Sequence, residues 1–430
     1  MHYFSTNRRS PNANFREAVL AGQPDDRGLY FPSEIPRHDV NFFNGLDDLS
    51  TGDLAFQVMK PYIMGEITDD ELARICHETV NFEMPLVRLT DEISALELFH
   101  GPTLAFKDVG ARFMSRCLGY FSRAFSEKTV VVVATSGDTG GAVAAGFHNV
   151  DGVEVVILFP KGRVSKVQEM QLTRLGENVT TLELHGSFDD CQAIAKQLLA
   201  DEALRGKAKL TSANSINIAR WLPQQIYYFA AIARWDGEPP IFCVPSGNLG
   251  NLAAGMLANA SGLPVKRFIA ACNANDVVPR YMETFKYRPR PSITTLSNAM
   301  DVGDPNNFVR ILEIFGHDDA KLAEVFSAKS ISDVETAATM REMYEQCNYI
   351  ADPHGAVAFR VLRDNLDRAT GEKGIFLETA HPVKFDSVAD ILGFESALPT
   401  SISELASRPS ASIEVENDYE AVRDILVGKL

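Results

Sequence analysis

The sequence lacks the features of a secreted, membrane-bound or metal-stapled protein. Its six cysteines are scattered without a CxxC pair, which argues against a disulfide framework or a structural zinc site. No stretch approaches the roughly 18 consecutive apolar residues of a spanning helix. The opening MHYFSTNRRSPNANF contains no apolar signal-peptide segment. These absences predict a cytoplasmic protein with reduced thiols.

Positive charge is also scarce. The chain carries 41 lysines and arginines against 57 aspartates and glutamates, a net charge of −16. Such a surface repels nucleic-acid phosphates and anionic lipid, so we expect neither nucleic acid nor a membrane as a partner. A small phosphorylated substrate is compatible with this balance where local positive charge or oriented amides line its pocket.

Length and apolar patterning predict the fold class. At 430 residues the chain exceeds one ordinary core. From about residue 129, β-branched runs alternate with turns and helical segments. In TVVVVATSGDTGGAVAAGF we expect a strand over 130–134, a turn over 135–140 and a helix from 141. This alternation predicts an α/β fold with mostly parallel sheets covered by helices on both faces.

The first 90 residues differ, because they hold several prolines and short helical patterns without a strong strand–turn–helix unit. We therefore expect a small N-terminal domain over residues 1–90. A smaller α/β domain over 91–225 and a larger one over 226–430 would follow. These boundaries are approximate and allow the chain to cross between the last two domains.

Lys107 is the first candidate catalytic residue, because it closes the apolar run in HGPTLAFKDVGARF. One interpretation is an exposed helix start whose lysine stem covers apolar surface. The other is a partly desolvated amine, whose lowered pKa makes it a nucleophile toward a carbonyl. On this stretch alone the first interpretation is favoured.

Two glycine-rich turns follow predicted strands, where ligands bind in doubly wound sheets. The turn over 136–141 matches neither GxGxxG nor a Walker motif. The turn over 246–251 would combine close backbone approach with unpaired helix N–H groups, as a phosphate cradle does. Each turn alone is equally well explained by tight βα geometry. Together with a candidate carbonyl-reactive lysine they favour pyridoxal phosphate, an aldehyde cofactor that carries a phosphate.

Other chemistry-bearing residues carry less weight. His100, His354 and His381 lie in motifs, but a histidine is more often a structural hydrogen-bonding group than a catalyst. No set of His, Asp and Glu has metal-ligand spacing, so we expect no metal, and a GxSxG nucleophile elbow is absent. The basic stretch KGRVSK (161–166) is explained better by a solvated face than by a phosphate entry.

Several motifs occur in an order typical of one family. They are ELFHGPTLAFKD, ATSGDTGGA, SANSINIAR, VPSGNLGN, LSNAMDVGDPNN, DPHGAVA and LETAHPVKF, after the opening NFREAVLAGQPDDRGLYFP. Over nearly its whole length the chain resembles the threonine synthase family, in its shorter bacterial and fungal branch. The resemblance implies the fold-type II architecture of pyridoxal-phosphate enzymes. That architecture has two open, mostly parallel sheets covered by helices, an active site between them and, in this branch, a small N-terminal domain.

The resemblance also implies a reaction. The enzyme would eliminate phosphate from O-phospho-L-homoserine and add water at Cβ, which gives L-threonine in the last step of threonine biosynthesis. Lys107 would form a Schiff base with pyridoxal 5′-phosphate and then move protons at Cα and Cβ. The protein would act on this small molecule as a monomer or a homodimer.

Cofactor contacts are implied by the same resemblance. The cofactor phosphate would be held by the turn of Ser246, Gly247, Asn248, Leu249 and Gly250. Thr379 would place a hydroxyl at the pyridine nitrogen. Asp138 stands where many fold-type II enzymes carry asparagine beside the cofactor's phenolic oxygen. Two anionic oxygens repel there unless one keeps a proton.

Substrate contacts follow from two further motifs. Ser136 and Thr139, with amides of their turn, would meet the substrate carboxylate. Asn214, Ser215 and Arg220 would bind the substrate phosphate, because a guanidinium supplies the fork geometry and charge that a phosphate needs.

Two other functions stay open on sequence grounds. A fold-type II serine or threonine dehydratase would share the lysine and the second glycine turn but would not need Arg220. A catalytically idle cofactor-binding protein on this scaffold is the other alternative, and Lys107 with the intact second turn argues against it.

Overall fold

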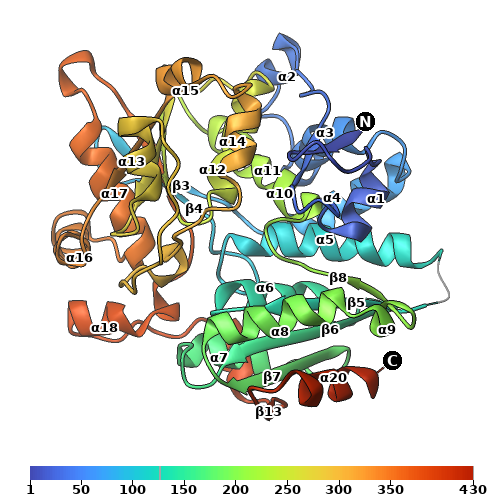
Figure 1. The fold of residues 1–430 in the computed structure, drawn as a ribbon. Helices are drawn as coiled ribbons and strands as arrows, with labels where there is room; N and C mark the ends of the chain where they lie inside the picture. The colour runs from blue at the N-terminus through green and yellow to red at the C-terminus, as the bar shows by residue number, and fades with distance from the viewer. Residues whose placement is uncertain (125–126, 430) are drawn as a thin grey trace.

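The computed structural model describes residues 1–124 and 127–429 and arranges them around three sheets (Figure 1). A two-stranded sheet lies in the N-terminal segment, and a six-stranded and a five-stranded sheet form the rest. The fold is α/β with mostly parallel strands, as the alternation of apolar runs and helical segments predicts. No helix in the described residues is long and apolar enough to cross a membrane.

The N-terminal segment is helical around a short antiparallel strand pair, and it lies at the upper right of Figure 1 in blue. Its elements are β1 (Tyr3–Ser5), α1 (Phe15–Ala21), β2 (Tyr30–Pro32), α2 (Val40–Asn44), α3 (Thr51–Ile63) and α4 (Asp69–Thr79). Asn14 and Glu17 cap α1 reciprocally, which fixes the start of that helix. The Tyr3 hydroxyl donates to the Tyr62 carbonyl at 2.6 Å, which joins the strand pair to α3.

The five-stranded sheet is parallel throughout, in the order β13-β7-β6-β5-β8. Its strands are β5 (Thr129–Ala134), β6 (Val153–Pro160), β7 (Val179–His185), β8 (Lys209–Thr211) and β13 (Ile413–Glu416). The helices around it are α6 (Asp138–Phe147), α7 (Lys166–Thr173), α8 (Phe188–Ala200), α9 (Glu202–Arg205), α19 (Thr400–Ala406) and α20 (Tyr419–Val427). In β5, Val131 and Val133 share a core with α6, whereas Val130 and Val132 share one with α8 and α20. The continuous apolar run reflects a strand buried on both faces.

The six-stranded sheet has the order β11-β10-β9-β12-β4-β3, in which β3 pairs antiparallel with β4 and the other neighbours are parallel. Its strands are β3 (Leu86–Arg88), β4 (Ile93–Glu97), β9 (Ile241–Pro245), β10 (Arg267–Cys272), β11 (Phe326–Ser330) and β12 (Gly374–Glu378). The helices of this half are α10 (Ile218–Trp221), α11 (Gln225–Ile232), α12 (Gly250–Ala260), α13 (Val277–Thr284), α14 (Phe308–Ile314), α15 (Asp319–Val325), α16 (Asp333–Cys347), α17 (Pro353–Asn365) and α18 (Asp386–Leu392). Helix α5 (Lys107–Ser122) packs against α6 and β6 of the five-stranded sheet on one side and against α4 and α10 on the other. Short 3-10 turns are η1 (Leu222–Gln224), η2 (Asn298–Met300), η3 (Arg368–Thr370) and η4 (Pro382–Lys384).

The two large sheets do not use consecutive blocks of the chain. β3 and β4 precede the five-stranded sheet in sequence but join the six-stranded one, and β13 returns to the five-stranded sheet near the C-terminus. Each large sheet therefore combines segments from both sides of residue 225. The domain division at residues 90 and 225 stays a prediction.

Carboxyl ends of parallel strands position the candidate site, as in other open α/β sheets. β4 leads to the Lys107 segment, β5 to the turn before α6, β9 to the turn before α12, and β12 to Thr379. One boundary differs from expectation, because α6 begins at Asp138 rather than at residue 141. The Thr135 hydroxyl accepts the N–H groups of Gly137 at 3.0 Å and Gly140 at 2.9 Å, which closes the turn sooner.

Candidate active site

Backbone pairing holds the lysine segment against the end of β12. The Phe106 N–H donates to the Thr379 carbonyl at 2.9 Å, and the His381 N–H donates to the Leu104 carbonyl at 3.0 Å. Lys107, the first residue of α5, therefore lies beside Thr379 although the two residues are far apart in the sequence. The Thr379 hydroxyl makes no hydrogen bond within the described residues, so it is free to bind a ligand atom.

The Lys107 side chain is largely removed from water, with 19% of it exposed. Burial lowers the pKa of Lys107, and the nearby cations Lys384 and Arg220 lower it too, whereas Asp138 acts in the opposite direction. The contact from Lys107 Nζ to Asp138 Oδ2 is 3.8 Å, too long for a hydrogen bond. These surroundings favour the nucleophilic interpretation of Lys107 over the exposed helix start.

The turn after β9 presents unpaired amides at the start of α12. The N–H groups of Gly247, Asn248, Leu249 and Gly250 make no hydrogen bond in the part of the chain that the structure describes. A Cβ at Gly247 would lie 2.6 Å from Met300 Cα, so this position requires glycine. Free amides at a helix start suit an anion, and the phosphate of pyridoxal phosphate has the charge that such amides bind.

The Ser215 hydroxyl links this turn to the segment predicted to bind the substrate phosphate. Asn248 Nδ2 donates to Ser215 Oγ at 2.7 Å, and Asn307 Nδ2 donates to it at 3.4 Å. A hydroxyl that accepts twice keeps its own proton for an anion. Ser246 differs, because its hydroxyl donates to the Val244 carbonyl at 2.8 Å.

Arg220 is a buried cation, 4% exposed, without a carboxylate in ion-pair distance among the described residues. Its Nη1 donates to the Ala213 carbonyl, while its Nε has no partner there. Burial lowers the pKa of Arg220 to about 10. Gly110 on α5 makes room for it, since a Cβ at that glycine would lie 3.1 Å from the Arg220 Nε. An unpaired buried guanidinium suits a phosphate group, and half-buried Asn214 lies in the same segment.

The polar side chains around the start of α6 differ in their exposure to solvent. Ser136 is exposed and Thr139 is half-buried in the first turn of α6, where both remain accessible to a ligand. Asp138 is buried instead and accepts a hydrogen bond from Gln168 Nε2 at 3.0 Å. Gly137, with a φ of 139°, leaves space for that amide, because a Cβ there would lie 2.6 Å from Gln168 Nε2.

Lys384 was not singled out by the sequence analysis, although it lies in the motif LETAHPVKF. Its fully buried Nζ is 2.8 Å from Asp138 Oδ1 and donates to the Thr103 carbonyl at 2.7 Å. Burial alone would raise the pKa of Asp138, but Lys384 and Lys107 hold it well below its usual range. Asp138 is therefore an ionised carboxylate that already has a cation partner.

Two buried acids lie behind Thr379. Glu378 Oε1 accepts the Asp352 N–H at 2.8 Å, while Glu378 Oε2 and Asp352 Oδ2 have no hydrogen-bond partner in the described residues. Burial raises the pKa of Glu378 well above its usual value, and the charge of Asp352 raises it further. The Glu378 carboxyl therefore keeps its proton in the folded protein at pH values where an exposed glutamate has lost it.

Glu378→Gln is expected to flatten the pH dependence of stability. Since the unfolded chain releases this proton at a lower pH than the folded one, stability falls as pH rises from the usual pKa of glutamate toward the raised folded value. The slope for one proton is about 1.4 kcal/mol per pH unit. Chemical unfolding at a series of pH values should show a shallower decline for Glu378→Gln, with exposed Glu404→Gln as the matched control. Equal slopes in the variant and the wild type would contradict the protonated state.

The three motif histidines make structural contacts. His354 Nδ1 is 2.6 Å from Asp352 Oδ1 and its Nε2 accepts the Ala299 N–H at 3.2 Å, which uses both ring nitrogens. His100 Nε2 lies 2.7 Å from Glu97, and His381 Nδ1 accepts an N–H at the start of η4. No group of three or more His, Cys, Asp and Glu in the described residues is arranged to hold a metal ion.

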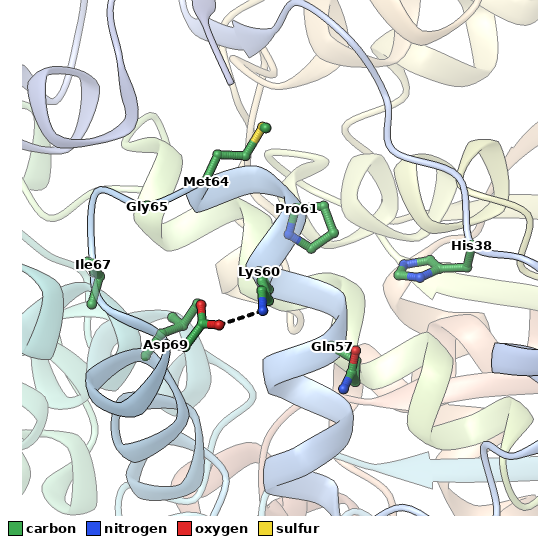
Figure 2. Close-up of a pocket in the computed structure, with 9 residues that line it drawn as sticks. His38, Gln57, Lys60, Pro61, Met64, Gly65, Ile67 and Asp69 are labelled. Carbon is green, nitrogen blue, oxygen red and sulfur yellow. Dashed lines mark hydrogen bonds and ion pairs between the residues drawn. The ribbon is translucent and has the colours of Figure 1, made fainter.

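Other polar features lie outside this arrangement. In the KGRVSK stretch, exposed Lys161 pairs with Glu414 at 2.6 Å, as on a solvated face. A hollow of about 380 Å³ lies beside α3, and Lys60 and Asp69 on its wall are paired at 2.6 Å. Figure 2 shows the side chains that line it. A second hollow of about 450 Å³ is lined by seven residues of α13 and the loop after it, of which four are basic and one, Glu283, is acidic. None of the predicted site residues lines either hollow.

Comparisons with known proteins agree over the whole chain. Family models match for a pyridoxal-phosphate dependent enzyme over residues 85–377, the threonine synthase N terminus over 2–80 and the threonine synthase C-terminal region over 355–426. A threonine synthase of Haemophilus influenzae is 42% identical over 431 residues, which cover 99% of this chain and 100% of the relative.

Solved structures of threonine synthases share the fold of this chain over nearly its whole length. Threonine synthase from Escherichia coli has a TM-score of 0.92 at 40% identity and covers 100% of both chains. Pyridoxal-phosphate-bound threonine synthase from Brucella melitensis has a TM-score of 0.94 at 35% identity, covering 99% of this chain and 98% of that one. A threonine deaminase from Solanum lycopersicum, at 14% identity and a TM-score of 0.56, shares the fold alone; it covers 88% of this chain and 98% of its own.

Proposed function

The chain belongs to the threonine synthase family of pyridoxal-phosphate-dependent lyases, and we propose that its substrate is O-phospho-L-homoserine. The products would be L-threonine and inorganic phosphate. Protons would leave Cα and Cβ, the Cγ–O bond would break so that phosphate leaves with its electron pair, and a proton would be delivered to Cγ. Water would then add its hydroxyl to Cβ, and a proton would return to Cα. The cofactor, when bound, supplies the electron sink that such proton removals require.

Lys107 would bind the cofactor covalently through its aldehyde. Beside the bound substrate, the Lys107 amine would carry protons at Cα and Cβ. The burial that lowers its pKa supports this role, because a neutral amine accepts a proton. The Thr379 hydroxyl would meet the pyridine nitrogen, and a hydroxyl does not force that nitrogen to be protonated as a carboxylate would.

Two anion sites would hold the substrate and the cofactor. The amides of Gly247, Asn248, Leu249 and Gly250 would bind the cofactor phosphate, with Ser246 at its edge. Arg220, Asn214 and Ser215 would bind the substrate phosphate, and Ser136 with Thr139 would meet its carboxylate. Asp138 would lie beside the phenolic oxygen, where the charge of Lys384 offsets the repulsion between two anionic oxygens.

The observation that carries the substrate proposal is the buried Arg220, whose Nε has no partner in the described residues. A serine or threonine dehydratase acts on a substrate without phosphate, so a buried unpaired guanidinium in its substrate pocket would cost stability without a compensating contact. We further propose a cytoplasmic location, which the scattered cysteines support.

The test is product analysis with the purified protein. O-phospho-L-homoserine should yield phosphate and L-threonine in equal amounts, whereas L-serine and L-threonine should release little ammonia and oxo acid. Rapid ammonia release from serine or threonine, without phosphate release from phosphohomoserine, would instead support the dehydratase alternative.

A further inference from the structure

One carboxylate faces two lysines in the candidate active site. Asp138 Oδ1 is 2.8 Å from Lys384 Nζ, and its Oδ2 is 3.8 Å from Lys107 Nζ. Lys384 is fully buried and also donates to the Thr103 carbonyl at 2.7 Å. Lys107 Nζ makes no hydrogen bond within the described residues. The two amines therefore differ, since Lys384 Nζ lies within hydrogen-bond distance of two acceptors and Lys107 Nζ of none among the described residues.

We propose that Lys384 is a positioning residue that occupies Asp138 and so leaves Lys107 as the amine that gives up its proton. Gln168 Nε2 binds the same Oδ1 at 3.0 Å and keeps the carboxylate turned toward Lys384. Without Lys384, the negative charge of Asp138 would act undiminished on Lys107 and hold it as an ammonium, which is not nucleophilic. This inference rests on the proposed role of Lys107 as the cofactor lysine.

The charged groups that face Lys107 come from several elements. They are Asp138 on α6, Lys384 on η4, Arg220 on α10 and Asp352 before α17. Burial is the main reason why the pKa of Lys107 is lowered; Asp138 raises it, and Lys384 and Arg220 lower it. Asp138 and Lys384 form a nearly neutral pair. Removing Lys384 should therefore raise the Lys107 pKa, and removing Asp138 should lower it.

The test is the pH dependence of the visible absorbance of the holoenzyme, which reports the protonation of the Lys107 nitrogen in its bond to the cofactor. Lys384→Met leaves Asp138 uncompensated and should raise this apparent pKa by about 1–3 pH units, the range for an opposite charge at this distance. Asp138→Asn leaves Lys384 uncompensated and should lower it. The double variant should titrate close to the wild type, and Lys384→Arg should restore the wild-type value. Exposed Lys166→Met is the matched control and should cause no shift.

Each outcome decides one point. If Asp138→Asn and the double variant titrate alike, Lys384 has no influence on Lys107 and the proposal is overturned; this comparison stands even where Lys384→Met alone fails to fold. A Lys384→Met holoenzyme that titrates like the wild type overturns it as well. Borohydride reduction of the wild type distinguishes failure of this proposal from failure of the proposed function, because it fixes the cofactor to the lysine that binds it. A cofactor fixed to another lysine contradicts the role of Lys107 itself. A cofactor fixed to Lys107, without opposite pKa shifts in Lys384→Met and Asp138→Asn, contradicts only the role of Lys384.

Discussion

Lys107→Ala should reduce threonine formation from O-phospho-L-homoserine by at least about 10³-fold, because one substitution removes both the covalent anchor of the cofactor and the proton carrier beside the substrate. The environment of Lys107 supports so large an effect. Its side chain is 19% exposed, and its pKa is lowered mainly by burial. Steady-state assays that follow phosphate and threonine measure this loss.

Lys166→Ala is the control for this variant, because Lys166 is an exposed lysine outside the candidate site. It should keep wild-type turnover. Lys107→Ala should remain folded and should still bind the cofactor noncovalently at the amides after β9. Dialysis should therefore remove the cofactor from this variant. Threonine formation within tenfold of the wild type would refute the assignment of Lys107.

Arg220→Ala should lower kcat/KM for O-phospho-L-homoserine by about 2–4 kcal/mol of transition-state stabilisation, which corresponds to roughly 30- to 1,000-fold. The reason is that Arg220 is a buried cation whose Nε has no partner among the described residues, so a substrate phosphate is its expected counter-ion. Cofactor absorbance should stay as in the wild type, because the cofactor phosphate is assigned to the turn after β9.

Arg234→Ala supplies the comparison, since Arg234 is an exposed arginine just after α11. Its kinetics should be unchanged. Arg220→Lys should recover only part of the loss, because an ammonium keeps the charge but not the fork of donors. If Arg220→Ala loses its cofactor absorbance together with its activity, Arg220 supports the fold of the site through Ala213 and does not select the substrate.

Local sequence patterns predicted the parts of the site that single segments form. Continuous β-branched runs identified the buried strands, and glycine-rich turns directly after them indicated the loops before α6 and α12. The lysine at the end of an apolar run made Lys107 a candidate, although that stretch alone favoured an exposed helix start, and the family resemblance implied Arg220 and Thr379. The strands and turns depend on neighbours in sequence, so a local pattern can reveal them.

Contacts between distant segments were not predictable in this way. Lys384 lies in a recognised motif, but nothing in its neighbourhood indicates that its Nζ binds Asp138 on another element. The early start of α6 depends on the Thr135 side chain rather than on periodicity. The protonated state of Glu378 likewise requires the N-terminus of α17 to pack against the end of β12.

Oxygen-18 water gives the most direct test of the reaction proposed for this site. The purified protein is incubated with O-phospho-L-homoserine in labelled water, and both products are analysed by mass spectrometry. Elimination across Cβ and Cγ followed by water addition predicts one labelled oxygen in the hydroxyl of L-threonine and none in the phosphate, because the Cγ–O bond is broken and the P–O bond is not. Label in the phosphate, with L-homoserine as the second product, would contradict the account.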